Sequence, residues 1–165
     1  MFHIDYASIF QNFSPELATV LIAMLPIAEL RAAIPVAIVG FEMSWWSAYI
    51  WAVIGNIIPA FFLVWLLDPV SKWLMKHSKI FNKFFNWVFD RTRKKFTTRA
   101  KRYGSFIALV LFVAIPLPIT GAWTGSVAAF LFGISFKKSM TAITTGVLIA
   151  GLIVSIMTIG AVTIF

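Results

Sequence analysis

The ten residues 26–35 read Pro-Ile-Ala-Glu-Leu-Arg-Ala-Ala-Ile-Pro, and they lie inside an otherwise apolar stretch of the chain. A charged side chain costs roughly 2.5–3.5 kcal/mol at the middle of a membrane, so Glu29 and Arg31 are both expensive there. Residues two apart face nearly opposite sides of a continuous helix and cannot pair. Pro26 and Pro35 favour a break in the helix, which removes this restriction. The motif therefore predicts a polar site inside the bilayer, at an interruption of the helix.

The composition identifies lipid as the solvent for most of the chain. Hydrophobic residues make up 61% of the 165, charged residues 12%, and the mean hydropathy is +0.92. A soluble domain of this size could not bury so much apolar surface. The chain has no cysteine, and His3 and His77 have no metal-ligand spacing around them. Phosphate-binding glycine loops, zinc-protease helices and nucleophile elbows are also missing, so we expect no metal, no cofactor and no enzyme.

Four apolar blocks divide the chain, and two of them do not read as simple spans. Blocks 43–67 and 139–165 are long enough to cross about 30 Å of hydrocarbon. Block 17–41 is interrupted at 26–35, and block 105–134 at Pro-Leu-Pro-Ile-Thr-Gly. The arms of the first block would each be about 14 Å long as helices and would reach only the midplane. We therefore expect 17–41 and 105–134 to be re-entrant hairpins that return to their own side of the membrane.

The distribution of basic residues favours this arrangement over four continuous spans. Eleven of the fourteen Lys and Arg residues lie between Lys72 and Arg102, so the positive-inside rule places segment 70–102 in the cytoplasm, beside the cell membrane. Lys137 and Lys138 follow the second interrupted block. They share the cytoplasmic side if that block is re-entrant, whereas four continuous spans would place them outside. The same reasoning predicts that the N-terminus is outside.

Segment 70–102 predicts a basic amphipathic helix on the membrane surface. Apolar residues recur in it at near-helical spacing, with lysines between them that would face anionic headgroups: Trp73, Leu74, Phe81, Phe84, Phe85, Val88 and Phe89, with Lys72, Lys76, Lys79 and Lys83. Basic residues beside aromatic ones also occur in nucleic-acid-binding proteins. The neighbouring membrane segments argue against such a partner here.

The two halves of the chain resemble each other weakly. Each has an interrupted hairpin, a short linker and a full span with a glycine ten or eleven residues in, Gly55 or Gly146. Because one cytoplasmic segment lies between them, the second half starts from the opposite side, and the repeats would be inverted as in many secondary transporters. The alternative is that hydrophobic composition makes any two membrane segments look alike.

Two motifs are similar to the signature blocks of a known family. They are the stretch 26–35 and the stretch 115–126, which reads Ile-Pro-Leu-Pro-Ile-Thr-Gly-Ala-Trp-Thr-Gly-Ser. In order and spacing they resemble the small multi-drug export family, a relative of the DedA-like membrane proteins. The DedA-like proteins are associated with re-entrant hairpins and with moving the lipid carrier undecaprenyl phosphate across the membrane. The resemblance implies a transporter of polyprenyl phosphate or a related lipid, although this chain lacks the arginines of their second hairpin.

The residues of these motifs form the candidate site. Arg31 and the helix N-termini near the hairpin tips, predicted around Ala32 and Ile119, are suited to hold a phosphate. Glu29 would be a counter-ion of Arg31 or a proton carrier. The other candidates offer hydroxyl groups or shape the tips and the route: Pro26, Pro35, Pro116, Pro118, Thr120, Gly121, Trp123, Thr124, Gly125 and Ser126. The alternative is that Glu29 and Arg31 only pair and cap the hairpins.

We predict an all-α integral membrane protein of two inverted repeats, each a re-entrant hairpin followed by a transmembrane helix, with the basic helix between them. The predicted function is transport of a phosphate-bearing lipid, with proton or ion coupling and a homodimer as options. One alternative is a small cationic drug or ion antiporter of four continuous helices that uses Glu29, against which Pro26, Pro35 and Arg31 argue. Another is a membrane-organising protein without transport, in which Glu29 and Arg31 are dispensable.

Overall fold

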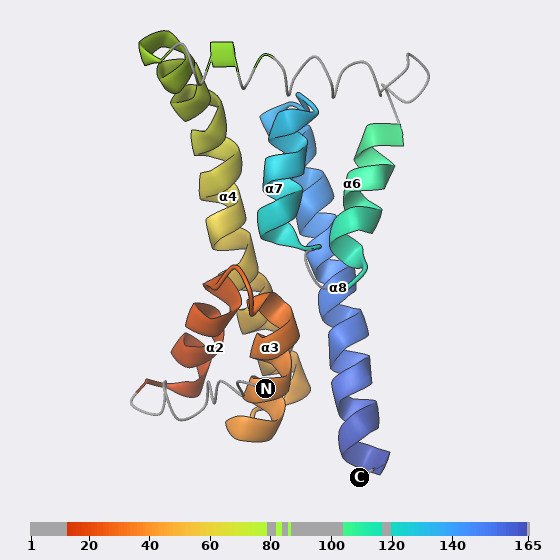
Figure 1. The fold of residues 1–165 in the computed structure, drawn as a ribbon. Helices are drawn as coiled ribbons and strands as arrows, with labels where there is room; N and C mark the ends of the chain where they lie inside the picture. The colour runs from red at the N-terminus through yellow and green to blue at the C-terminus, as the bar shows by residue number, and fades with distance from the viewer. Residues whose placement is uncertain (1–12, 79–81, 84–85, 87–103, 117–119, 165) are drawn as a thin grey trace.

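The computed structural model of the chain describes residues 13–78, 82–83, 86, 104–116 and 120–164. Within these ranges every regular element is a helix and none is a strand, which confirms the predicted all-α class. Of the helices, α4 and α8 are long and apolar enough to cross a membrane. The elements are α2 (Pro15–Met24), α3 (Glu29–Pro35), the π-helix η1 (Val36–Gly40), α4 (Trp45–His77), α6 (Gly104–Ala114), α7 (Ala122–Leu131) and α8 (Phe136–Ile164) (Figure 1).

The first pair of short helices, α2 and α3, packs together on either side of a turn at 25–28. The Ser14 hydroxyl accepts a hydrogen bond from the N–H of Leu17 at the start of α2, as a helix cap does. Leu25 is extended because it precedes Pro26, and α2 ends there. At 1.5 Å per residue, α2 is about 15 Å long and α3 with η1 about 18 Å, roughly half of a hydrocarbon core. We refer to α2 and α3 as hairpin 1.

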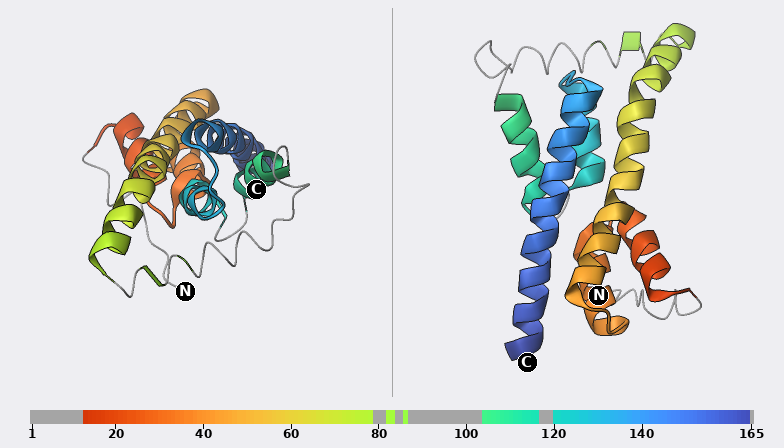
Figure 2. Two further views of the ribbon diagram at one scale, coloured as in Figure 1. Left: turned by 90° about the horizontal axis from the view of Figure 1, so that it is seen from above. Right: turned by 180° about the vertical axis from the view of Figure 1, so that it is seen from behind.

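A second pair, α6 and α7, has the same form and is referred to as hairpin 2. Its helices are about 16 and 15 Å long, contact each other and are joined through 115–121. Figure 1 shows both hairpins with their turns toward the middle of the molecule, so that the two turns face each other. Figure 2 shows from behind that α4 and α8 run the length of the molecule beside the hairpins. The turns therefore meet about halfway along the two long helices.

The interruption in hairpin 1 is shorter than the sequence predicted. It covers 25–28, and the second arm begins at Glu29 rather than near Ala32. Pro35 does not break the helix. α3 continues through it, and the N–H of Val36 bonds to the carbonyls of Ala32 and Ala33. The chain then widens into η1, whose last turn is closed by a hydrogen bond from the N–H of Phe41 to the carbonyl of Val36.

Two glycines allow the first helix of each hairpin to approach the long helix that follows it. A Cβ on Gly55 of α4 would lie 2.5 Å from the backbone oxygen of Val20 in α2. A Cβ on Gly146 of α8 would lie 2.6 Å from the Cβ of Val113 in α6. Alanine is also the commonest residue of the buried core, as in closely packed membrane helices. Small residues thus set the spacing of the helices in both halves.

Helix α4 extends beyond the predicted span 43–67. It continues through Pro69 to His77, so the segment predicted to start at residue 70 begins inside α4. An exposed ion pair between Lys72 and Asp68, with Nζ and Oδ2 2.6 Å apart, spans the turn that contains this proline. Apart from 82–83 and 86, the rest of the predicted amphipathic helix after Ser78 lies outside the described residues. Helix α8 begins three residues before the predicted span 139–165.

The described lysines gather at one end of the molecule. Lys72 and Phe136, which starts α8, line the same cavity, and Lys137 and Lys138 follow Phe136 directly. Figure 1 shows the C-terminal end of α4 and the start of α8 at the same end of the molecule. The N-terminal ends of α2 and α4 and the C-terminal end of α8 lie at the opposite end (Figure 1).

Candidate binding site at the two hairpin turns

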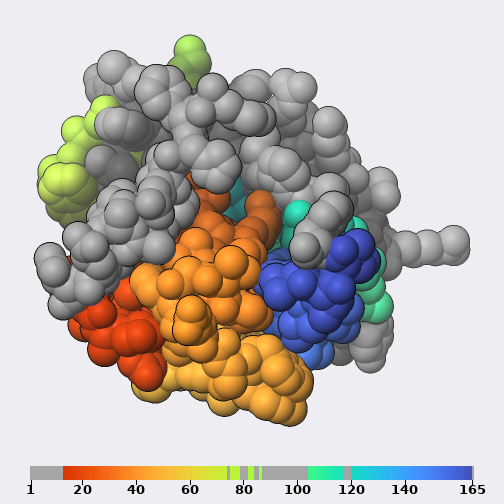
Figure 3. All heavy atoms as spheres, turned by 90° about the horizontal axis from the view of Figure 1, so that it is seen from below, coloured from red at the N-terminus to blue at the C-terminus, as the bar shows by residue number. Residues whose placement is uncertain are grey.

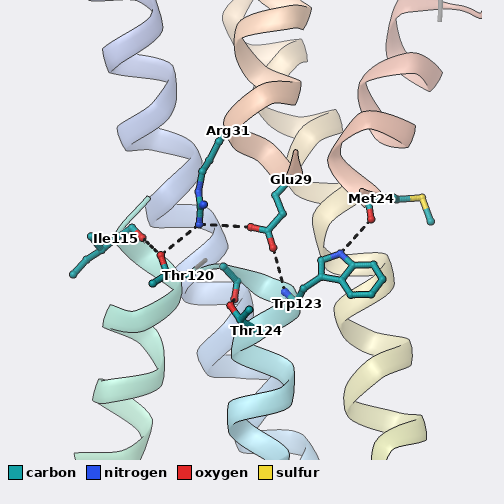
Figure 4. A network of polar contacts seen from close by, with 8 residues as sticks. Met24, Glu29, Arg31, Ile115, Thr120, Trp123 and Thr124 are labelled. Atoms are coloured by element: carbon teal, nitrogen blue, oxygen red, sulfur yellow. Dashed lines mark hydrogen bonds and ion pairs between the residues drawn. The ribbon is translucent and has the colours of Figure 1, made fainter. Parts of the chain in front are cut away.

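Glu29 is the first residue of α3, and its side chain reaches hairpin 2. Its Oε1 accepts a hydrogen bond from the backbone N–H of Trp123 at 3.3 Å, and Trp123 is the second residue of α7. The first N–H groups of a helix have no partner within it, and the N-terminus attracts negative charge. Gly121, the residue before α7, makes no side-chain cap. Glu29 therefore caps α7 from the other hairpin (Figure 4).

Backbone geometry lets the Glu29 carboxylate occupy this position. Glu29 has a φ of +47°, in the left-handed region that is uncommon for residues other than glycine. A Cβ on Gly121 would meet the Glu29 carboxylate, so a larger residue there would require that carboxylate to move. Glu29 is almost fully buried, with 5% exposure. Strained backbone of this kind persists where the surroundings hold it, often at functional sites.

Arg31 lies in the first turn of α3 and contacts both Glu29 and hairpin 2. Its Nη2 is 3.8 Å from Oε2 of Glu29 and donates a hydrogen bond to the Thr120 hydroxyl at 3.4 Å. That hydroxyl donates in turn to the carbonyl of Ile115 at 2.8 Å. A guanidinium has five N–H donors, and these two long contacts involve one of its nitrogens. Among the described residues, the other N–H groups of Arg31 therefore have no acceptor, and an anion could accept hydrogen bonds from them.

Trp123 connects the two hairpins a second time. Its indole N–H donates a hydrogen bond to the carbonyl of Met24, the last residue of α2, at 3.2 Å. Figure 4 shows Glu29 between Arg31 and Trp123, with Thr120 beside Arg31. The carbonyls of Met24 and Ile115 were not predicted from the sequence, because a backbone acceptor has no sequence signature.

The structure brings five of the predicted residues into contact at the turns: Glu29, Arg31, Thr120, Gly121 and Trp123. Thr124 follows in the first turn of α7, and its hydroxyl donates to the carbonyl of Gly121 at 3.4 Å. Pro26 is exposed at the turn of hairpin 1. Pro118 lies outside the described residues.

Gly125 and Ser126 lie away from the turns, inside the packing of hairpin 2. A Cβ on Gly125 would lie 2.6 Å from Cγ2 of Val113 in α6. The buried Ser126 hydroxyl donates to the carbonyl of Ala122 at 2.7 Å. These two residues shape the hairpin, and neither contacts Glu29 or Arg31 in the interactions of the described residues.

A groove of about 450 Å³ extends from Arg31 between α3–η1 and α8, toward the end of the molecule opposite the lysines. Figure 3 shows the last turns of α8 beside α3 and η1 at that end. Pro35 and Pro116 were predicted as site residues from the sequence, but none of the α8 residues was. The helical spacing of those α8 residues indicates that they share one face. Besides Arg31, the groove is lined by Pro35, Val39, Pro116, Val154, Met157, Thr158, Ala161 and Val162.

The helix N-terminus at hairpin 2 differs from the prediction. It lies at Ala122 rather than near Ile119, and the Glu29 carboxylate already caps it. No three His, Asp or Glu side chains gather into a metal site within the described ranges. The arrangement is an anion-attracting helix N-terminus, capped by an acidic side chain of the protein, next to an arginine that makes only two long contacts with the described residues.

Comparison with known families agrees with the two sequence motifs. A family model described as "Putative small multi-drug export protein" matches residues 29–153, most of the chain, including both Glu29 and Trp123. The comparisons with curated proteins and with solved structures returned no match. The description of this family indicates export proteins. The two long apolar helices, α4 and α8, are consistent with a chain embedded in a membrane. The chain belongs to this small multi-drug export family of membrane proteins.

Proposed function

We propose that the chain transports a lipid with a phosphate head group, of the polyprenyl phosphate type, across the membrane. The observation that carries the proposal is Arg31, a guanidinium with 23% side-chain exposure that contacts both hairpin turns through one nitrogen. A charged side chain at this depth costs roughly 2.5–3.5 kcal/mol unless it is satisfied. A phosphate would offset that cost and accept charge-assisted hydrogen bonds from the remaining donors.

In this proposal hairpins 1 and 2 are re-entrant, and α4 and α8 cross the membrane. The short helices support this, because each covers roughly half of a hydrocarbon core. The positive-inside rule favours the end that carries Lys72, Lys137 and Lys138 as the cytoplasmic side of the cell membrane, with anionic headgroups near these lysines. Irregular backbone is tolerated at the midplane where protein surrounds it, and both Glu29 and Gly121 are buried.

We further propose that the two halves are inverted repeats. Each hairpin is followed by a long helix with a glycine, Gly55 or Gly146, against the first helix of that hairpin. The long helices run in opposite directions (Figure 1). Secondary transporters use repeats of this kind to bring broken helices together at a binding site near the midplane.

The Glu29 carboxylate competes with the substrate phosphate for the position beside Arg31 in the proposed site. Its carboxylate caps the N-terminus of α7 and lies 3.8 Å from Arg31. A phosphate bound to Arg31 would stand close to this carboxylate, and the two negative charges repel each other unless Glu29 moves or takes up a proton. Substrate binding would then be linked to protonation of Glu29, which provides a route to proton coupling.

The resemblance of the two motifs to DedA-like proteins supports a polyprenyl phosphate as the substrate. Since the arginines of the second DedA-like hairpin are missing here, the phosphate would depend on Arg31. The Thr120 hydroxyl and the N–H of Trp123, when Glu29 releases it, are the neighbouring groups that could assist.

The test uses purified protein in phosphatidylcholine vesicles. Transfer of a labelled polyprenyl phosphate between leaflets is compared with uptake of a cationic dye. We expect lipid transfer by the wild type and none by Arg31→Leu. Dye uptake without lipid transfer would instead support a cation antiporter that uses Glu29. Absence of both activities would favour a membrane-organising protein.

A further inference from the structure

We infer that the groove between α3–η1 and α8 holds the part of the hydrocarbon chain next to the phosphate while the phosphate of the transported lipid is at Arg31. The inference rests on the proposed function and adds a site for the chain to a site for the head group. The volume of the groove, about 450 Å³, falls within the roughly 300–1,000 Å³ of small-molecule sites.

Each wall of the groove is one face of a helix. Arg31, Pro35 and Val39 follow each other at intervals of four residues along α3 and η1. Val154 and Thr158 have the same interval on α8, and Ala161 continues that face. Between Arg31 and Val39 the helix rises about 12 Å. The groove therefore follows these two helix faces, with the guanidinium at the end nearest the hairpin turns.

Apart from Arg31, no described residue of the lining has a polar group that needs a partner. The hydroxyl of Thr158 donates to the carbonyl of Val154 in its own helix at 2.8 Å, and the other lining side chains are apolar. Val39 and Met157 are 61% and 64% exposed, so the groove is open at its side. A hydrocarbon chain can enter it from the surrounding lipid without separating the hairpins. One charged end and a long apolar remainder match a lipid with a single anionic head.

Charge argues against two other occupants of the groove. A cationic drug would bring its positive charge to Arg31. A second copy of the chain would have to bring a carboxylate to Arg31 or leave its donors unused. Besides Glu29, the acidic residues that the structure describes stand toward the ends of the helices rather than at the hairpin turns: Glu16 in the first turn of α2, Glu42 before α4 and Asp68 near the end of α4.

Two variants that fill the groove from opposite walls test the inference. Ala161→Phe acts from α8 and Val39→Phe from η1. Thr163→Phe is the matched control, since it adds similar bulk at an exposed position of α8 that does not line the groove. Binding is measured in phosphatidylcholine nanodiscs as the rise in unfolding temperature with added ligand. The ligands are a long-chain polyprenyl phosphate, a five-carbon isoprenyl phosphate and dioleoyl phosphatidate.

We expect both groove variants to bind the long-chain phosphate at least tenfold more weakly than the wild type and the Thr163→Phe control do. The five-carbon phosphate should bind all four proteins alike, because it does not reach along the groove. If both groove variants bind the long-chain phosphate with wild-type affinity, the groove does not hold the hydrocarbon tail. The proposed function would be unaffected by that result. A wild type that does not bind the long-chain phosphate would overturn both. If dioleoyl phosphatidate, which has two acyl tails, binds as tightly as the long-chain phosphate, the groove does not select a lipid with one hydrocarbon tail.

Discussion

The backbone N–H of Trp123 donates a hydrogen bond to the carboxylate of Glu29 over 3.3 Å, although the residues are 94 positions apart in the sequence. This contact joins the turns of hairpins 1 and 2. The same carboxylate lies 3.8 Å from Nη2 of Arg31. One side chain therefore caps α7 and also sets the charge beside Arg31.

Two substitutions of Glu29 separate these roles. Glu29→Gln keeps an oxygen that can accept from Trp123 but removes the charge, so we expect a stability close to wild type and loss of transport. Glu29→Ala also removes the cap and should lower the free energy of unfolding by about 1 kcal/mol. Thermal unfolding in nanodiscs measures the difference. Equal stability of the two variants would mean that Glu29 does not cap α7.

Gly121→Ala should displace the Glu29 carboxylate, because the new Cβ would overlap with Oε2. We expect a loss of about 1–3 kcal/mol in unfolding free energy, the usual cost of overpacking. In a Glu29→Ala background the loss should be smaller, with a coupling of about 0.5–3 kcal/mol. Gly160→Ala is the control, since no atom lies within 4 Å of a Cβ there. Additive effects at Gly121 and Glu29 would contradict the contact.

The sequence predicted features with a local physical cause. Charges and prolines in 26–35, and prolines in 115–121, indicated where the two hairpins turn and most of the residues that stand there, although Gly125 and Ser126 lie inside the packing of hairpin 2. Local signals could not show that Glu29 caps α7, because that contact depends on how two distant segments pack. They also predicted a longer interruption, over 26–35, whereas the helix resumes at Glu29 and continues through Pro35 into a π-helix. The lining of the groove by α8 was missed because an apolar residue that faces a groove looks the same in sequence as one that faces lipid.

The packing glycines of the two halves should respond alike to substitution. Gly55→Ala would place a Cβ 2.5 Å from the backbone oxygen of Val20, and Gly146→Ala would place one 2.6 Å from the Cβ of Val113. Each should lower stability by about 1–3 kcal/mol, although alanine favours a helix over glycine by roughly 1 kcal/mol. Gly160→Ala should show only that helix preference. Stabilisation by either substitution would contradict the close approach of α2 to α4 or of α6 to α8.

Cysteine labelling across the membrane distinguishes hairpins from four spans. The chain has no cysteine, and Ser44 and Lys138 are exposed at opposite ends of the molecule, whereas Ser139 is buried and unsuitable. With re-entrant hairpins, an impermeant thiol reagent should label Ser44→Cys from outside and Lys138→Cys from the cytoplasmic side, together with Lys76→Cys. Labelling of Ser44→Cys and Lys138→Cys from the same side would require four continuous spans.

The pH dependence of lipid binding tests the central claim, that Arg31 and Glu29 form a site for a lipid phosphate, most directly. Binding of a long-chain polyprenyl phosphate is measured by thermal stabilisation between about pH 5.5 and 8 for the wild type, Glu29→Gln and Arg31→Leu. Protonation of Glu29 removes its repulsion, so it strengthens binding as the pH falls. The phosphate also titrates in this range, with a second pKa of about 6, and Glu29→Gln reports that contribution alone.

We predict that the wild type gains affinity relative to Glu29→Gln as the pH falls, and that Arg31→Leu binds the lipid at no pH. The unfolding temperature of each variant without ligand shows whether it is folded. Identical pH profiles of the wild type and Glu29→Gln would contradict the role of Glu29. Full binding by Arg31→Leu, or stabilisation by a cationic drug and none by the lipid, would contradict the phosphate site itself.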